Sequence, residues 1–139
     1  MKKITVILIS LIFIMSCNEK SSIIGNTIKI NGLEIAEYDL PKNLNWFDAN
    51  QKAIELGDGW RLPDWEELDT IIQHKTEIPN IKFNEIYWSS FSCNENQAHY
   101  HIVKDFNYYD LIDNRCYNKG NLFYVRLVRG KLPELNLYK

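Results

Sequence analysis

His99 and His101 have the spacing that comes nearest to a metal site in this sequence. They stand at i and i+2 in Ala98–Phe106, a strand-like segment, so both imidazoles are expected on one strand face. Zinc sites normally need three or four converging ligands, and His74 is the one remaining histidine. We therefore expect neither a metal nor another cofactor.

Ser89 and Ser90 follow Trp88, and a serine hydroxyl can act as a nucleophile. A serine hydrolase also needs a positioned base and an oxyanion hole, and the sequence has no G-x-S-x-G turn. Ser89 is therefore expected to make structural hydrogen bonds, and the chain is not expected to be an enzyme.

Cys93 and Cys116 form an even pair within the expected domain. In an exported protein such a pair favours a disulfide, and closing this loop would stabilise the fold by about 3 kcal/mol. Two unrelated buried thiols are the alternative.

The N-terminus has the layout of an export signal. Two lysines precede the apolar run Ile4–Met15, which is too short to cross a bilayer as a helix but suits the core of a signal peptide. The run ends in Ile14-Met15-Ser16-Cys17, which resembles the lipobox of bacterial lipoproteins. We expect cleavage before Cys17, lipidation of its thiol, and a place in the cell envelope, in the outer membrane.

The rest of the chain has the size and charge of one globular domain. The sequence of 139 residues has a formal net charge of −2, and loss of residues 1–16 would remove two lysines and no acidic residue. No basic stripe that would bind nucleic acid is present. We expect a signal peptide at 1–16, the lipidated Cys17 with a short tether at 17–26, and one domain at 27–139.

Two helix starts are predicted by their capping residues. Asn45 is a good N-cap, Asp48 follows three residues later, and Gly57 supplies a stop. Asp64 and Glu67 form the pattern of a capping box. The expected buried faces are Trp46, Ala49, Ala53 and Leu56 on the first helix, and Trp65, Leu68, Ile71 and Ile72 on the second.

Strand-like segments lie on both sides of these helices. The first two flank Asn31-Gly32, the strongest short-range hairpin signal. The segments are Thr27–Ile30, Leu33–Tyr38, Glu85–Phe91, Ala98–Phe106 and Leu122–Arg129. The order of strands, two helices and strands predicts an α+β fold with an antiparallel sheet.

Three motifs carry a resemblance to a known family. They are Gly59-Trp60-Arg61-Leu62-Pro63, Tyr87-Trp88-Ser89-Ser90 and Val125-Arg126-Leu127-Val128-Arg129. With Trp46 and Ala49 on the preceding helix, they resemble the C-terminal domain family of the Legionella collagen-like protein, over Asn45 to Gly130. The resemblance implies a C-type-lectin-like fold with two helices packed on an antiparallel sheet and a long loop region.

The sequence departs from that family at two cysteine positions. Ala53 and Leu127 stand where members often have cysteines, which implies that Cys93 and Cys116 form a different bridge across the loop region. The namesake's association with sulfated glycosaminoglycans is not carried over, because an acidic domain lacks the cationic surface that such polymers need.

Most motif residues are expected to be structural. Trp60, Leu62, Trp65 and Trp88 are expected in the core, and the three arginines are expected to pair with carboxylates or carbonyls. The structural set is Trp46, Gly59, Trp60, Arg61, Leu62, Pro63, Trp88, Ser89, Arg126 and Arg129.

The segment Phe91–Asn121 is the expected ligand surface, because loops on a rigid frame can vary without unfolding the core. The adjacent Tyr108 and Tyr109 could bind sugars or peptides, or could equally cover the Cys93–Cys116 loop. The candidate residues are Asn94, Glu95, Asn96, His99, His101, Tyr108, Tyr109, Asp110, Asn114 and Arg115.

Two classes of function remain open. A membrane-anchored, adhesin-like module that binds an envelope or extracellular protein or glycan would keep Phe91–Asn121 open. A structural or accessory subunit of a cell-envelope complex would have this region covered by a partner protein.

Overall fold

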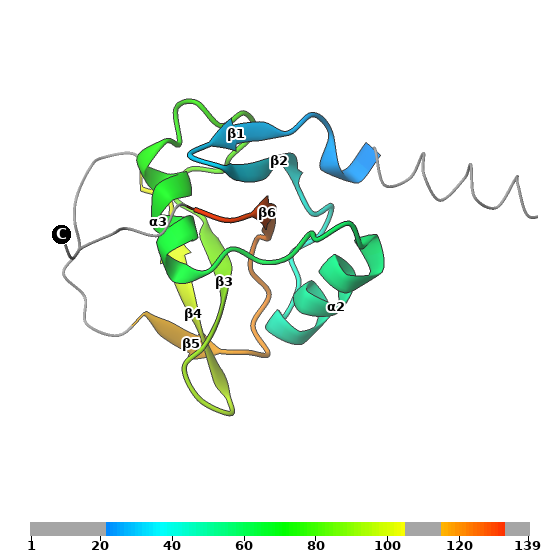
Figure 1. Ribbon diagram of the computed structural model, residues 1–139. Coiled ribbons are helices and arrows are strands. Elements are labelled where there is room, and N and C mark those ends of the chain that lie inside the picture. The colour runs from blue at the N-terminus through cyan, green and yellow to red at the C-terminus, as the bar shows by residue number, and fades with distance from the viewer. Residues whose placement is uncertain (1–21, 105–114, 133–139) are drawn as a thin grey trace, which may run out of the picture.

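The computed structural model describes residues 22–104 and 115–132 (Figure 1). Within them, β1 (Ile28–Ile30) and β2 (Leu33–Asp39) form the expected hairpin. Asn31 and Gly32 have φ angles of 49° and 85°. Two successive positive φ values are those of a type I′ turn, whose twist matches that of the flanking strands, so the hairpin prediction is confirmed.

The first predicted helix is α2 (Trp46–Leu56), and its caps confirm the expected bounds. The Asn45 side chain accepts a hydrogen bond from the Asp48 backbone N–H, and Gly57 ends the helix with a φ of 64°. Ala49, Ala53 and Leu56 form its buried face, as the spacing predicts.

The second helix is α3 (Trp65–Gln73), which begins with the expected capping box of Asp64 and Glu67. The expectation that Trp65 lies in the core was wrong, because this side chain is 47% exposed. The buried face of α3 instead contains Glu67, with Leu68 and Ile71. With this rotation of the helix, Glu67 pairs with Arg61 and Trp65 faces solvent.

Among the described residues, six strands form two antiparallel three-stranded sheets, with orders β1-β2-β6 and β3-β4-β5. The later strands are β3 (Ile86–Ser92), β4 (Gln97–Ile102), β5 (Cys116–Asn118) and β6 (Arg126–Gly130). An isolated parallel bridge joins Tyr87 of β3 to Tyr124, which lies two residues before β6. The coarse α+β prediction is therefore confirmed for the described residues.

The expected closing strand Leu122–Arg129 is longer than the strand observed. Phe123 and Tyr124 form only isolated bridges, to Leu44 and Tyr87, so the chain passes from one sheet to the other here before β6 begins. The short β5 was not predicted.

Two hydrophobic clusters pack between the helices and the two sheets. One contains the buried face of α2 with Trp88 and Trp60. The other contains Leu68 and Ile71 of α3 with Tyr87. Figure 1 shows α2 on one side of the molecule and α3 on the other, with β6 between them. In the part of the chain described here, no helix combines the length and apolar character needed to span a bilayer.

The predicted disulfide is present. Cys93 follows β3 and Cys116 begins β5, and the two are bonded across 23 positions of sequence. The bridge therefore ties the edge strand β5 to the β3–β4 hairpin.

Candidate functional site

Four polar side chains from three parts of the chain meet at one face of the β3-β4-β5 sheet. We call Asp69, His99, His101 and Arg115 the histidine cluster. The Asp69 Oδ1 of α3 lies 2.7 Å from the His101 Nε2 of β4. Arg115 Nη1 also contacts His101 Nε2. The cluster therefore joins a helix, a strand and the residue that leads into the edge strand.

The antiparallel register explains why these residues converge. His99 pairs with Cys116 across β4 and β5, and the Tyr100 N–H donates to the Arg115 carbonyl at 2.9 Å. His99 and His101 lie two residues apart, so their side chains share the face that α3 covers. Three of the predicted ligand-binding residues are thus brought together by sheet pairing.

His99 is fixed by a buried serine. Its Nδ1 lies 3.2 Å from the Ser89 Oγ, which accepts a hydrogen bond from the Phe91 N–H at 3.2 Å. We assign the hydroxyl proton of Ser89 to Nδ1, since a fully buried hydroxyl needs an acceptor. His99 then carries its own proton on Nε2, which leaves that atom as a donor.

Burial keeps His99 neutral. It lowers the pKa of this imidazole to about 4, and the charges of His101 and Arg115 act in the same direction while Asp69 opposes them. The hydrogen bond with His101 lowers the pKa of the Asp69 carboxyl. The cluster therefore presents an ionised carboxylate beside a neutral imidazole at neutral pH.

Trp65 adds an exposed aromatic ring on the same side of α3. The Ser90 N–H donates to the Pro63 carbonyl at 2.7 Å, which places the start of α3 at the level of Ser90 on β3. Trp65 lies four residues, or about one turn, before Asp69, so both side chains point from one helix face. The indole and the histidine cluster could together contact a polar ligand that has one flat apolar face.

The predicted residues Asn94, Glu95 and Asn96 lie elsewhere, in the β3–β4 turn. The Asn94 Oδ1 accepts from the backbone N–H groups of Asn96 and Gln97, at 2.9 and 2.8 Å. This arrangement is a turn-forming one.

Lys119, which the sequence did not single out, secures this turn. It is only 6% exposed, and its Nζ donates to the carbonyls of Asn94 and Glu95, at 2.9 and 3.2 Å. The same Nζ lies 4.5 Å from the centre of the Trp46 ring, a cation–π distance. Lys119 therefore joins the turn to the first turn of α2.

Several predicted sites lie outside the described residues. These are the lipidation site Cys17 and the candidate ligand residues Tyr108, Tyr109, Asp110 and Asn114.

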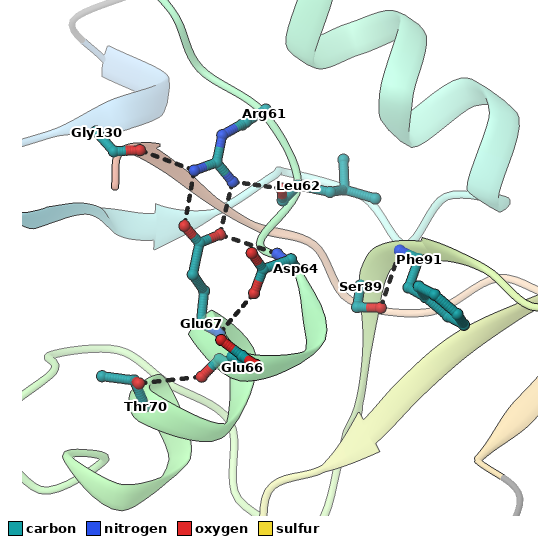
Figure 2. Close-up of polar contacts among 9 residues, drawn as sticks. All are labelled: Arg61, Leu62, Asp64, Glu66, Glu67, Thr70, Ser89, Phe91 and Gly130. Carbon is teal, nitrogen blue, oxygen red and sulfur yellow. Dashed lines mark hydrogen bonds and ion pairs between the residues drawn. The ribbon is translucent and has the colours of Figure 1, made fainter. Parts of the chain in front are cut away.

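The arginine of the first motif forms a bidentate ion pair. Its Nη1 and Nη2 lie 2.6 and 2.7 Å from the two carboxylate oxygens of Glu67 (Figure 2). Arg61 also donates to the Gly130 carbonyl at 2.8 Å, and Glu67 Oε2 accepts from the Asp64 N–H at 2.9 Å. The pair thus connects the capping box of α3 with the end of β6, and it raises the pKa of Arg61.

The other two motif arginines also pair with carboxylates. Arg126 is fully buried and donates to Asp39 Oδ1 at 2.7 Å. Arg129 donates to Glu34 Oε2 at 2.5 Å and lies 4.8 Å from the Trp60 ring. Each of the three arginines is thus paired with a carboxylate of the fold, and the buried Nη2 of Arg126 is the one of its nitrogens without a hydrogen-bond partner.

The remaining motif residues hold the core together. Trp60, Leu62 and Trp88 are at most 5% exposed. Trp46 is partly buried, and its indole N–H donates to the Ser89 carbonyl at 2.9 Å. Pro63 is buried at the entry to α3, and Gly59 has a φ of 78°, a conformation that suits glycine.

Sequence reasoning missed Asp69 and the exposed position of Trp65. The i, i+4 spacing of the two residues on α3 is the signal that could have placed them together. In the described ranges 22–104 and 115–132, no group of three or more His, Cys, Asp or Glu side chains is arranged to hold a metal ion.

Comparison with known proteins adds no family assignment: no protein-family model matches the sequence, and no curated protein matches it significantly.

Proposed function

We propose that this chain is an exported lipoprotein, anchored through Cys17 to the bacterial outer membrane, whose domain binds a ligand without catalysis. The sequence Ile14-Met15-Ser16-Cys17 supports the anchor, because it has the form of a lipobox. The Cys93–Cys116 disulfide supports an oxidising compartment, where such bonds persist.

The same proposal includes a C-type-lectin-like fold. Its support is the order of the three motifs and of the elements that carry them, with two helices between an N-terminal hairpin and the later strands. In such a fold the scaffold is rigid and the ligand is bound by residues beside it.

The histidine cluster is the observation that carries the ligand-binding role. It places the Asp69 carboxylate, the neutral His99 and the Arg115 guanidinium together, and all of these side chains are at least partly accessible. Clusters of titratable groups with shifted pKa values gather at functional sites more often than elsewhere. The ligand class is a polar envelope protein or glycan.

Ser89 supports a non-catalytic role. It lies within hydrogen-bond distance of His99, as a nucleophile would lie near its base, yet its side chain is fully buried. Its hydroxyl is also occupied by His99 and the Phe91 N–H. A substrate in solution therefore has no access to this oxygen in the structure.

A second candidate is an accessory subunit of an envelope complex. It is favoured by three large apolar side chains that are exposed around the second sheet: Phe91 at 51%, Tyr117 at 47% and Leu122 at 61%. A partner protein that covered them would gain buried apolar area.

The test is a glycan array combined with cross-linking capture from envelope extracts. Wild type is compared with Asp69→Asn, which removes one charge from the cluster, and with Glu55→Gln, a matched change on α2. The ligand-binding proposal expects a ligand that Glu55→Gln retains and Asp69→Asn loses. A ligand bound equally by all three proteins would refute the histidine cluster as the site.

A further inference from the structure

The outer face of α2 carries two large apolar side chains in contact with solvent. Phe47 is 58% exposed and Ile54 is 70% exposed. They are seven residues apart, which is about two helical turns, so they share one face. That face is opposite the one that buries Ala49 and Ala53.

The helix carries one basic residue, Lys52, and two acidic residues, Asp48 and Glu55, so its formal charge is only −1. Lys52 and Glu55 form an ion pair at 3.6 Å, and Asp48 accepts a hydrogen bond from the Asn45 side chain at 2.7 Å. A nearly neutral apolar face suits a surface that is itself zwitterionic, and its binding should depend little on salt.

The described chain enters the domain on the same side as α2. Ile24 is buried in the same cluster as Ala53 and Leu56. The Asn26 N–H donates to Glu37 Oε2 at 2.8 Å, which fixes this entry against β2. Figure 1 shows the helical residues 22–24 at the side of the molecule away from α3.

The short tether limits which side of the domain can face a membrane. This step rests on the proposed lipidation of Cys17. Ser22 is five residues after Cys17, so the Cα atoms of Cys17 and Ser22 can lie at most about 18 Å apart. A domain of this size is roughly 34 Å across, so the tether is too short for the side that carries α3 to turn toward the bilayer.

We propose that the outer face of α2, with Phe47 and Ile54, lies on the phospholipid headgroup region of the anchoring membrane. The two side chains insert at the interface between headgroups and acyl chains, where partly exposed apolar residues of anchored proteins are stabilised. The histidine cluster then faces away from the bilayer, where a ligand can reach it.

Photo-crosslinking of the full lipidated chain in its native membrane tests this orientation. A photoreactive phenylalanine analogue replaces Ile54 or Phe47, and in a control protein it replaces Trp65, an exposed aromatic residue on α3. Mass spectrometry then identifies the adducts, and membrane fractionation of the same samples reports the anchor separately. We expect phospholipid adducts when the analogue is at position 54 or 47, and none when it is at position 65.

Each other outcome has a separate meaning. A membrane-bound protein with equal lipid adducts at Trp65, or with none at Ile54 and Phe47, overturns the orientation and leaves the lipoprotein proposal standing. Adducts to a protein at Ile54 overturn the orientation as well, in favour of a protein partner. A chain that does not fractionate with membranes refutes both the anchor and the orientation.

Discussion

The Asp69 Oδ1 lies 2.7 Å from the His101 Nε2, and this contact joins α3 to the middle strand of the second sheet. The two residues are far apart in sequence and belong to elements that were predicted independently. Their contact places an exposed carboxylate beside the half-buried His99 and Arg115. The proposed ligand site therefore depends on the packing of α3 against β4.

The Arg61–Glu67 pair should stabilise the whole fold. Glu67 is 2% exposed and accepts from Arg61 and from the Asp64 N–H, so Glu67→Ala leaves several donors without partners. We expect the free energy of unfolding to fall by about 1.5–3 kcal/mol, measured by urea denaturation. Glu66→Ala, one residue earlier and exposed, is the matched control and should change it by about 0.5 kcal/mol or less. Equal losses in the two variants would show that the pair contributes little.

The stability of the domain should depend on pH through His99. Its pKa is about 4 in the folded protein and near the ordinary 6.5 in the unfolded chain. Between these values the unfolded chain binds the proton and the folded protein does not, so the free energy of unfolding falls as the pH is lowered from about 6.5 to about 4. The lowered pKa of Asp69 acts in the same direction at the acid end.

NMR titration of the imidazole carbons measures this pKa directly. We expect His99 to remain neutral at pH 5.5, and His99→Gln to flatten the pH dependence of stability in this window. A His99 midpoint near 6.5 would be inconsistent with its burial against Ser89.

The disulfide should hold β5 in place. This strand has three residues, and within the described ranges 22–104 and 115–132 its one neighbour in the sheet is β4. Replacing both Cys93 and Cys116 with Ser should lower the free energy of unfolding by about 3 kcal/mol, given the length of the loop. Hydrogen exchange should rise first in residues 115–119. Mass spectrometry without reductant should find the two cysteines joined; two freely alkylated thiols in protein from the envelope would rule the bridge out.

The proposed lipid anchor has a direct test in Cys17→Ser. Acyl chains contribute about 0.8 kcal/mol for each buried methylene, so the loss of the modified cysteine should release nearly all of the protein from membranes. Fractionation and immunoblotting measure the release. A Cys17→Ser protein that remained with the membrane would contradict lipidation at this residue.

The sequence correctly predicted the hairpin and the starts of both helices, because each depends on residues close together in the chain. Asn31-Gly32 specifies its own turn, and the caps at Asn45 and Asp64 each use a side chain and a backbone group three residues away. The disulfide was predictable because the domain has two cysteines and the N-terminal sequence has the pattern of an export signal.

Contacts between distant segments could not be predicted in this way. The rotation of α3 places Glu67 on the buried face, where it pairs with Arg61, and leaves Trp65 exposed. The Asp69–His101 contact depends on that rotation and on the register of β4. No pattern of hydrophobic spacing within α3 contains this information.

The most direct test of the proposed ligand site uses the three histidines of the chain as reporters. His99 and His101 belong to the cluster, while His74 lies at the C-cap of α3 with its Nδ1 2.9 Å from the Thr70 carbonyl. The ligand recovered on the array or by capture is added to the protein while the imidazole resonances are recorded by NMR. The account predicts saturable shifts for His99 and His101 and none for His74. Saturated binding that leaves His99 and His101 unshifted would contradict it.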